Sequence, residues 1–235
     1  DDGAPSGLRD LDLRPGYDTG DDALHSFYVP TLSRAASYDR SVGYFRSSSL
    51  SVAAKGVARF IKGGGTMRLL VGAEIEAADQ DALTGAVELP DSFAERLASE
   101  LVPEDEIARR RLEVLAWLVK EQRLEVKVAI AVDSAGRPLV GGDTDPYFHL
   151  KVGVIRDAAD DAVAFQGSAN ESASGWKRNF EAISVFTSWA DGRHFDEWST
   201  RFDAYWSGNV PGFRVYWLPD AVRERLVEAA PSEPP

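Results

Sequence analysis

His149 and Lys151 are the residues whose types and spacing most directly suggest chemistry. They lie two apart in the strand-like run 148–155, and side chains two apart on a strand point to the same face of a sheet. Leu150 and Val152 then face the other side, where we expect the core. A neutral imidazole is a nucleophile, and a nearby ammonium group can hold phosphoryl oxygens. The pair therefore suits attack on a phosphodiester.

Further polar residues follow at short intervals along the chain. Ser168 and Asn170 come directly after Gly167, and Glu181 follows shortly afterwards. A hydroxyl and an amide can donate hydrogen bonds to phosphoryl oxygens, and a carboxylate can orient a catalytic imidazole by binding its second ring nitrogen. We predict that these side chains converge with the histidine and the lysine on one small volume.

The ordered set resembles the motif of the phospholipase D superfamily, in which histidine, any residue, lysine, four residues and aspartate precede glycine-serine-any-asparagine. In this chain the set reads His149-x-Lys151, Asp157, Gly167-Ser168-x-Asn170 and Asn179-x-Glu181. One spacing differs, because five residues separate Lys151 from Asp157. The strand-like runs 42–45 and 68–72 also resemble the amino-terminal half of phospholipase D-like domains in prokaryotic restriction and helicase-linked proteins.

This resemblance implies a role for each residue of the set. His149 would attack phosphorus and form a phosphohistidine, with Glu181 orienting its ring. Fixed donors to the phosphoryl oxygens are worth about 3 kcal/mol each in such sites. We expect Gly153 to leave space beside Lys151, and we expect no metal ion and no cofactor. The catalytic residues implied are His149, Lys151, Ser168, Asn170, Glu181 and Asp157; Lys177 and Arg178 are candidates for contacts with nucleic-acid phosphates.

The chain has a single His-x-Lys, whereas the mechanism of the superfamily uses two histidines, one as nucleophile and one as general acid. His25 and His194 have no comparable context, and we expect both to be structural or surface residues. The resemblance therefore implies a homodimer, in which a twofold axis places one His149 from each subunit across a shared cleft.

Composition limits the classes of protein to consider. The 235 residues are 44% hydrophobic, which suffices for one sizeable core, and the absence of cysteine excludes disulfides and thiolate zinc sites. No apolar run approaches the roughly 20 residues of a membrane span, and no signal peptide opens the chain, so we expect a cytoplasmic protein without membrane partners. The net charge of -12 argues against strong autonomous DNA binding, although a basic cleft on an acidic body is compatible with it.

Hydrophobic periodicity predicts alternating helices and strands, which indicates an α/β fold with a mixed sheet flanked by helices. We expect an extended lead over 1–20, a phospholipase D-like catalytic domain over 21–230, and a linker-like end over 231–235, cut from a longer protein. The arginine run 109–111 is expected on a solvated helix face. Helices are predicted over 23–36, 49–62, 78–122 (with breaks near 89–90 and 103) and 191–207, and strands over 38–45, 67–71, 123–132, 148–155, 162–166 and 181–187.

Together these features predict an endonuclease of the phospholipase D type, which hydrolyses nucleic-acid phosphodiesters without a metal. DNA is the favoured substrate, and a restriction or anti-phage system, with a fused or associated helicase-type ATPase, is the expected setting. Two alternatives remain open. One is a catalytically silent module that docks nucleic acid or a partner, and the other is a phospholipase or phosphatidyltransferase, which the lack of an interfacial amphipathic helix disfavours.

Overall fold

A computed structural model of the chain describes residues 7–18, 20–45, 50, 53–54, 56–103, 105–141, 148, 150–167 and 182–235. Over these residues, eight strands form one mixed sheet in the order β1-β7-β6-β5-β2-β3-β4-β8. Strands β2, β3 and β4 are parallel to one another, and the other neighbours are antiparallel. The strands are β1 (Gly16–Asp18), β2 (Ala35–Tyr44), β3 (Thr66–Gly72), β4 (Leu124–Ala131), β5 (Val152–Asp157), β6 (Ala162–Gly167), β7 (Ala182–Thr187) and β8 (Phe213–Trp217).

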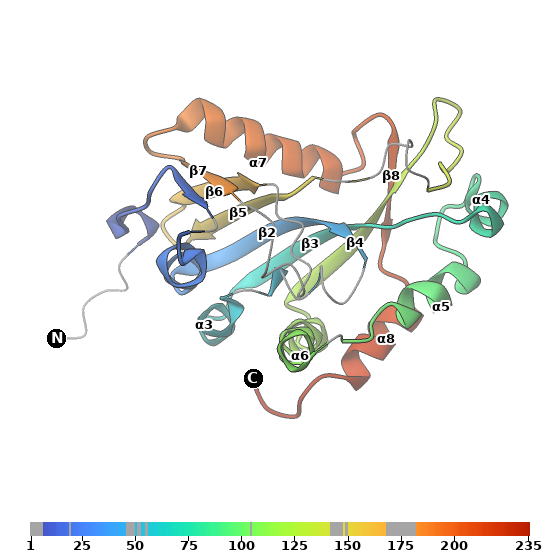
Figure 1. Ribbon diagram of the computed structural model, residues 1–235, viewed down its shortest axis with the longest axis horizontal. Helices are drawn as coiled ribbons and strands as arrows, with labels where there is room; N and C mark the ends of the chain where they lie inside the picture. Colours follow the sequence, from blue (N-terminus) through green and yellow to red (C-terminus); the bar gives the residue numbers. More distant parts are fainter. Residues whose placement is uncertain are drawn as a thin grey trace.

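Helices cover both faces of this sheet, so the predicted fold class of a mixed sheet flanked by helices is confirmed (Figure 1). Helix α7 lies along one face, and α3 and α6 lie on the other, with α5 and α8 packed beyond α6. The helices are η1 (Leu8–Asp10, 3-10), η2 (Leu24–Tyr28, a π-helix), α1 (Val29–Leu32), α3 (Val57–Lys62), α4 (Ala77–Leu83), α5 (Asp91–Ser99), α6 (Glu106–Lys120), α7 (Gly192–Trp206) and α8 (Asp220–Glu228).

Local sequence explains where the long helices begin and end. The side chain of Asp105 accepts a hydrogen bond from the backbone N–H of Ala108 at 2.7 Å and so caps α6. Helix α3 ends at the three glycines 63–65, of which Gly64 has a positive φ of 80° that favours glycine. The predicted breaks in the run 78–122 are confirmed, because α4, α5 and α6 are separate helices there.

The two faces of the sheet bury two apolar clusters. Phe202 of α7 packs with Val152 and Val154 of β5 on one face. Ile155 and Phe165 belong to the larger cluster on the opposite face, which α3 and α6 cover. The aromatic helix predicted over 191–207 therefore contributes to the core. None of the described helices has the length and apolar character that crossing a membrane requires.

The amino-terminal residues differ from the extended lead that we expected over 1–20. Leu8 is fully buried, and Tyr17 lies in β1, which pairs with β7 at the margin of the sheet. Strand β8 and helix α8 were not predicted either. Both are short, and their burial depends on β4 and α6, which are distant in the sequence.

Candidate active site

Six strands bring their termini to one end of the sheet, which we call the site end. Because β2, β3 and β4 are parallel, Tyr44, Gly72 and Ala131 all lie at this end. Strand β5 is antiparallel to β2 and therefore begins there, β6 ends there, and β7 begins there. Gly167 pairs with Ile183 across the last two strands. The described residues next to the histidine-lysine motif and next to the serine-asparagine motif thus meet at the same end.

Lys151 stands directly before β5 at the site end and is 6% exposed. Its backbone carbonyl accepts a hydrogen bond from the N–H of Gly167 at 3.2 Å, so it continues the pairing of β5 with β6. Leu150, Val152 and Val154 pack into the cluster under α7, which confirms the predicted alternation. Lys151 therefore projects from the opposite face of the sheet.

Two neighbours hold the backbone around this lysine in place. The hydroxyl of Ser41, which is fully buried on β2, accepts a hydrogen bond from the N–H of Val152 at 2.9 Å and donates to its carbonyl at 3.3 Å. Gly167 has no room for a side chain, since a Cβ there would lie 2.6 Å from the carbonyl oxygen of Ala182. The glycine of the Gly-Ser-x-Asn motif is therefore required by the close approach of β7.

Several candidate residues are not among those the structure describes. They are His149, Ser168, Asn170, Lys177, Arg178 and Glu181. Of the predicted site residues, Lys151 and Asp157 are described. His25 and His194 are both exposed, as predicted. Over the described residues there is no group of three or more His, Asp and Glu side chains placed to hold a metal ion.

The structure corrects the placement of Asp157, which lies at the other end of β5, about 20 Å from Lys151 along the strand. Its carboxylate accepts hydrogen bonds from the N–H groups of Leu8, Ala159 and Asp161 at 2.8, 2.9 and 3.0 Å. These bonds close the turn into β6 and anchor η1. Asp157 is thus a structural residue of the turn, and we remove it from the catalytic set.

The space expected beside Gly153 is filled. A Cβ on this glycine would lie 2.1 Å from the ring of Phe165, so the ring covers the glycine. The guanidinium carbon of Arg40 lies 4.9 Å from the centroid of the same ring. Arg40 is 3% exposed and was not among the predicted site residues. The adjacent charged residues Asp39 and Arg40 inside a predicted strand were the available signal, since charged residues are seldom buried without a specific partner.

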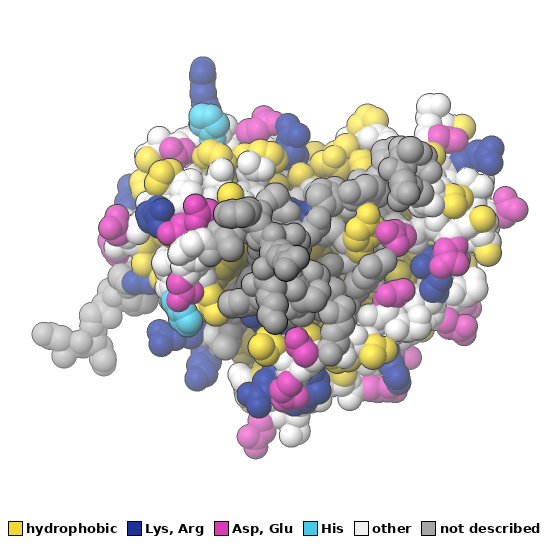
Figure 2. Space-filling model, viewed as in Figure 1, with side chains coloured by type: hydrophobic (Ala, Val, Ile, Leu, Met, Phe, Trp, Pro, Cys, Tyr) yellow, Lys and Arg dark blue, Asp and Glu magenta, His cyan; other side chains and the backbone are white. Residues whose placement is uncertain are grey.

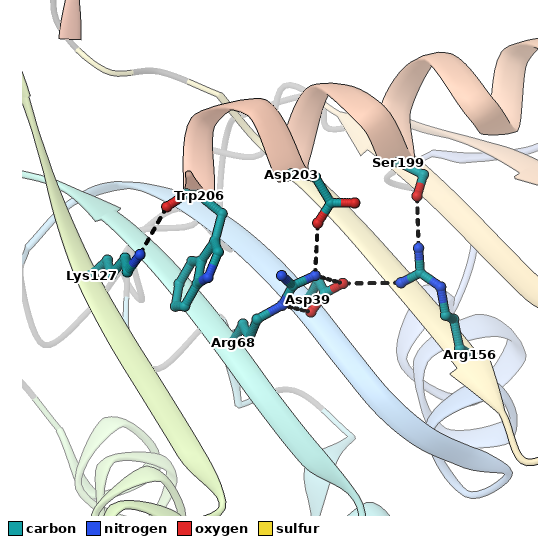
Figure 3. Close-up of polar contacts among 7 residues, drawn as sticks. All are labelled: Asp39, Arg68, Lys127, Arg156, Ser199, Asp203 and Trp206. Atoms are coloured by element: carbon teal, nitrogen blue, oxygen red, sulfur yellow. Dashed lines mark hydrogen bonds and ion pairs between the residues drawn. The ribbon is translucent and has the colours of Figure 1, made fainter. Parts of the chain in front are cut away.

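A second group of charged residues lies on the other face of the sheet, under α7 (Figure 3). Arg68 donates two hydrogen bonds of 2.7 Å to the buried carboxylate of Asp39, and Arg156 donates a third at 3.0 Å. Arg68 also binds Asp203 at 2.9 Å, and Arg156 binds the Ser199 hydroxyl at 2.7 Å, so the group ties α7 to the sheet. Hydrogen bonding to Asp39 raises the pKa of Arg68.

The surface charges agree with the sequence analysis. Arg109 and Arg110 are exposed on α6 and form ion pairs with Glu106 of the same helix, so the arginine run does lie on a solvated face. Over the described side chains in Figure 2, Lys and Arg are interspersed with Asp and Glu on the face shown. Among the described side chains of that face, the charges do not form a broad basic surface.

Comparisons with known proteins return solved structures alone. No protein-family model matches the chain, and no curated protein matches it. NucT from Helicobacter pylori aligns at a TM-score of 0.47 with 14% identity, over 82% of this chain and 95% of that one.

Two further structures cover only part of the other protein's length. Polyphosphate kinase from Porphyromonas gingivalis aligns at a TM-score of 0.46 with 9% identity, over 89% of this chain and 24% of that one. Phosphatidylserine synthase from Haemophilus influenzae aligns at 0.44 with 12% identity, over 91% and 44%. The chain thus spans less than half of these two proteins.

Proposed function

We propose that this chain is a phospholipase D-like phosphodiesterase that cleaves nucleic acid, with DNA as the favoured substrate. The observation that carries the proposal is the buried Lys151 at the site end, hydrogen-bonded through its backbone to Gly167. This pairing places the described residues of the His-x-Lys and Gly-Ser-x-Asn motifs next to each other. A buried cation at the place where strands of both motifs end suits the binding of a phosphoryl group.

The proposed reaction proceeds in two displacements. His149 attacks phosphorus through an unprotonated ring nitrogen, an N–P bond forms, and the P–O bond to the leaving group breaks. A second histidine donates a proton to the leaving oxygen and then accepts one from water, whose oxygen displaces His149. Glu181 orients the nucleophilic ring, while Lys151, Ser168 and Asn170 hold the non-bridging oxygens. This sequence of steps needs no metal ion.

The second histidine is proposed to come from another copy of the chain. The described histidines outside the motif are exposed on η2 and α7 and are poor candidates for a general acid at the site end. A twofold homodimer would supply His149 of the second copy instead. We further propose that Lys177 and Arg178 contact DNA phosphates. The acidic charge of the chain suits a cleavage domain of a restriction or anti-phage system in which another module, such as a helicase-type ATPase, captures the DNA.

The first test is cleavage of plasmid and oligonucleotide DNA in excess EDTA by the parent, His149→Ala and the control His25→Ala. His25 is an exposed histidine paired with Asp22, so its loss should leave cleavage unchanged. We expect EDTA-resistant cleavage that disappears in His149→Ala, together with an acid-labile phosphohistidine in the parent. Equal cleavage by all three proteins would overturn the proposal. If the parent and His149→Ala both bind DNA and the parent does not cleave it, the silent docking module is favoured.

The dimer can be tested separately by mixing. If each cleavage event uses His149 from two subunits, an excess of His149→Ala should lower the activity of a fixed amount of parent by forming mixed dimers. Sedimentation should show a mass of two chains at the concentrations used. A monomeric parent that keeps its activity in the mixture would exclude a shared site.

A further inference from the structure

Strand β8 forms one margin of the sheet, with β4 on its inner side (Figure 1). The N–H of Leu218 bonds to the carbonyl of Val126, which lies directly opposite it, so the even-numbered residues of β8 bond to β4. The N–H and C=O groups of Val215 and Trp217 therefore point away from the sheet. Across the part of the chain that the structure describes, none of these four groups forms a hydrogen bond.

The opposite margin of the sheet is protected in a way that β8 is not. Strand β1 has three residues, and the carboxylate of Asp21 accepts a hydrogen bond from the N–H of Asp18 at 2.9 Å. Charge and local capping of this kind keep an edge strand from pairing with another chain. Strand β8 combines open backbone groups with mostly apolar side chains. It is therefore the edge to which a further strand can be added.

A large apolar side chain stands beside this open edge. Trp217 is 58% exposed. The Nζ of Lys127 lies 4.4 Å from the centroid of its ring, and the ring of Trp206 packs edge-on against it at 6.0 Å. These contacts hold the indole in place and leave more than half of it to solvent. A strand added to β8 would cover the ring, because neighbouring side chains on one face of an antiparallel pair contact each other.

We propose that β8 pairs with β8 of a second copy of the chain, antiparallel about a twofold axis at Val215, so that the two sheets become continuous. The two Val215 residues then exchange two hydrogen bonds, and Trp217 of each copy lies opposite Phe213 of the other, as a favourable aromatic pair. Arg214 is the one charged residue of β8, and it lies opposite Tyr216 of the second copy rather than opposite its own counterpart. One twofold axis thus satisfies the open backbone groups and covers the exposed ring.

The flanking sequence selects this register and favours a second copy as the partner. Pro211 and Pro219 stand on either side of β8, and proline has no N–H to donate. Sliding the second copy by two residues in one direction places Pro211 opposite Trp217. Sliding it by two residues in the other direction places Pro219 opposite Phe213. The register centred on Val215 avoids both prolines, so the edge is complementary to itself.

This contact is distinct from the proposed shared active site. Strand β8 is the fourth strand along the sheet from β5, and neighbouring strands are about 4.8 Å apart, so the two Lys151 residues would be roughly 40 Å apart in the β8 pair. Two sites at that separation cannot act on one phosphodiester. The inference therefore does not depend on the proposed function, and if both contacts form, they join more than two chains.

The first experiment measures the mass of the full chain by sedimentation over a range of concentrations. Val215→Pro removes an N–H that points away from β4, and proline is tolerated at such positions of edge strands. Trp217→Ala removes the exposed ring and keeps the backbone. The matched control is Val87→Ala, because Val87 is 91% exposed and lies outside β8. Melting temperatures report the folding of each variant.

Crosslinking tests the register itself. The chain has no cysteine, so Val215→Cys introduces a single thiol whose counterpart lies directly across the proposed axis. Opposite residues of a hydrogen-bonded pair have Cα atoms about 5.5 Å apart, which a disulfide can span. Air oxidation should therefore yield a disulfide-linked dimer of Val215→Cys, while Val87→Cys should remain largely uncrosslinked.

We expect the parent to associate reversibly, and Val215→Pro to weaken this association by about 30-fold, because two hydrogen bonds across the axis are lost. Trp217→Ala should weaken it by about tenfold, as for an aromatic residue buried at an interface. Val87→Ala should leave it unchanged. If Val215→Pro does not fold, Trp217→Ala and the disulfide decide.

The outcomes separate this contact from the proposed function. The β8 pair would be overturned if folded Val215→Pro and Trp217→Ala sediment as the parent does, or if Val215→Cys forms a disulfide no faster than Val87→Cys. Either result leaves cleavage in EDTA unaffected as evidence for the nuclease. If Val215→Pro dissociates the assembly while the parent cleaves no DNA, the β8 pair stands and the proposed function fails.

Discussion

The two ends of β5 carry charged residues in contrasting surroundings. At the Asp157 end, one carboxylate accepts three backbone hydrogen bonds and closes a local turn. At the Lys151 end, a buried cation stands where strands β2, β3, β4 and β6 end. Local backbone donors account for the burial of the aspartate, whereas the lysine lies among the ends of several strands, next to Gly167. The structure gives Asp157 an architectural role at one end of the strand, and the proposed function assigns chemistry to Lys151 at the other.

The largest effect should come from Lys151→Met, which tests whether the site end performs chemistry. We expect diester cleavage to fall by about 10²–10³-fold, as when a preorganised donor is removed from a transition-state site. Rates of cleavage in EDTA and melting temperatures would be measured together. Lys127→Met, on the opposite face, is the control. An equal loss of activity in Lys151→Met and Lys127→Met would show that the loss is not specific to the site end.

A second substitution, Asp39→Ala, tests whether the charged group under α7 is purely structural. Removing this carboxylate leaves Arg68 and Arg156 facing each other, and breaking a buried pair in this way costs about 3–5 kcal/mol. The half-exposed Asp203 offers a matched control, since Asp203→Ala should cost less than about 1 kcal/mol. Urea unfolding gives both values. A large loss of kcat/KM in folded Asp39→Ala would contradict a structural role and extend the active site to this face.

The contrast between the ends of β5 is sharpened by Asp157→Asn. An amide cannot accept all three backbone N–H bonds, because one of its two polar atoms is a donor, and we expect a loss of about 2 kcal/mol of unfolding free energy. Since the site end is about 20 Å away, kcat/KM should stay at the parent's value below the melting transition. If the Asp157→Asn variant is as stable as the parent but inactive, this residue returns to the catalytic set.

The sequence was sufficient to predict those features that depend on local pattern. The strand alternation around Lys151, the glycine-terminated α3 and the breaks between α4, α5 and α6 all follow from periodicity and capping. The position of Asp157 could have been deduced too, because six residues along an extended strand cannot return to the same site. Asp157 was instead included in the catalytic set because of its place in the family motif.

The remaining features depend on which strands become neighbours. Arg40 pairs with Gly153, which lies over a hundred positions away in the sequence, and its guanidinium group lies over a ring supplied by β6. The network of Asp39, Arg68 and Arg156 likewise joins three strands that are separate in the sequence. Periodicity along one segment identifies a face but not its partner across the sheet, so such groups become visible only with the sheet order.

The smallest effect is expected from Glu106→Gln on the solvated face of α6, where charge serves neither a buried turn nor a ligand. Hydrogen bonds from Arg109 and then Arg110 lower the pKa of Glu106 from 4.5 to about 2. A lowered carboxyl pKa stabilises the fold above the ordinary value, and this contribution is lost as the pH falls from about 4.5 toward 2. The melting temperatures of parent and variant should therefore differ slightly at pH 7 and converge near pH 2. Because the pair is exposed to solvent, the difference at pH 7 should also shrink in high salt. The prediction would be contradicted by a difference in melting temperature that widens on acidification. It would also be contradicted by a difference as large as that between the parent and Asp157→Asn, because the exposed pair on α6 would then contribute as much to stability as the buried carboxylate of Asp157.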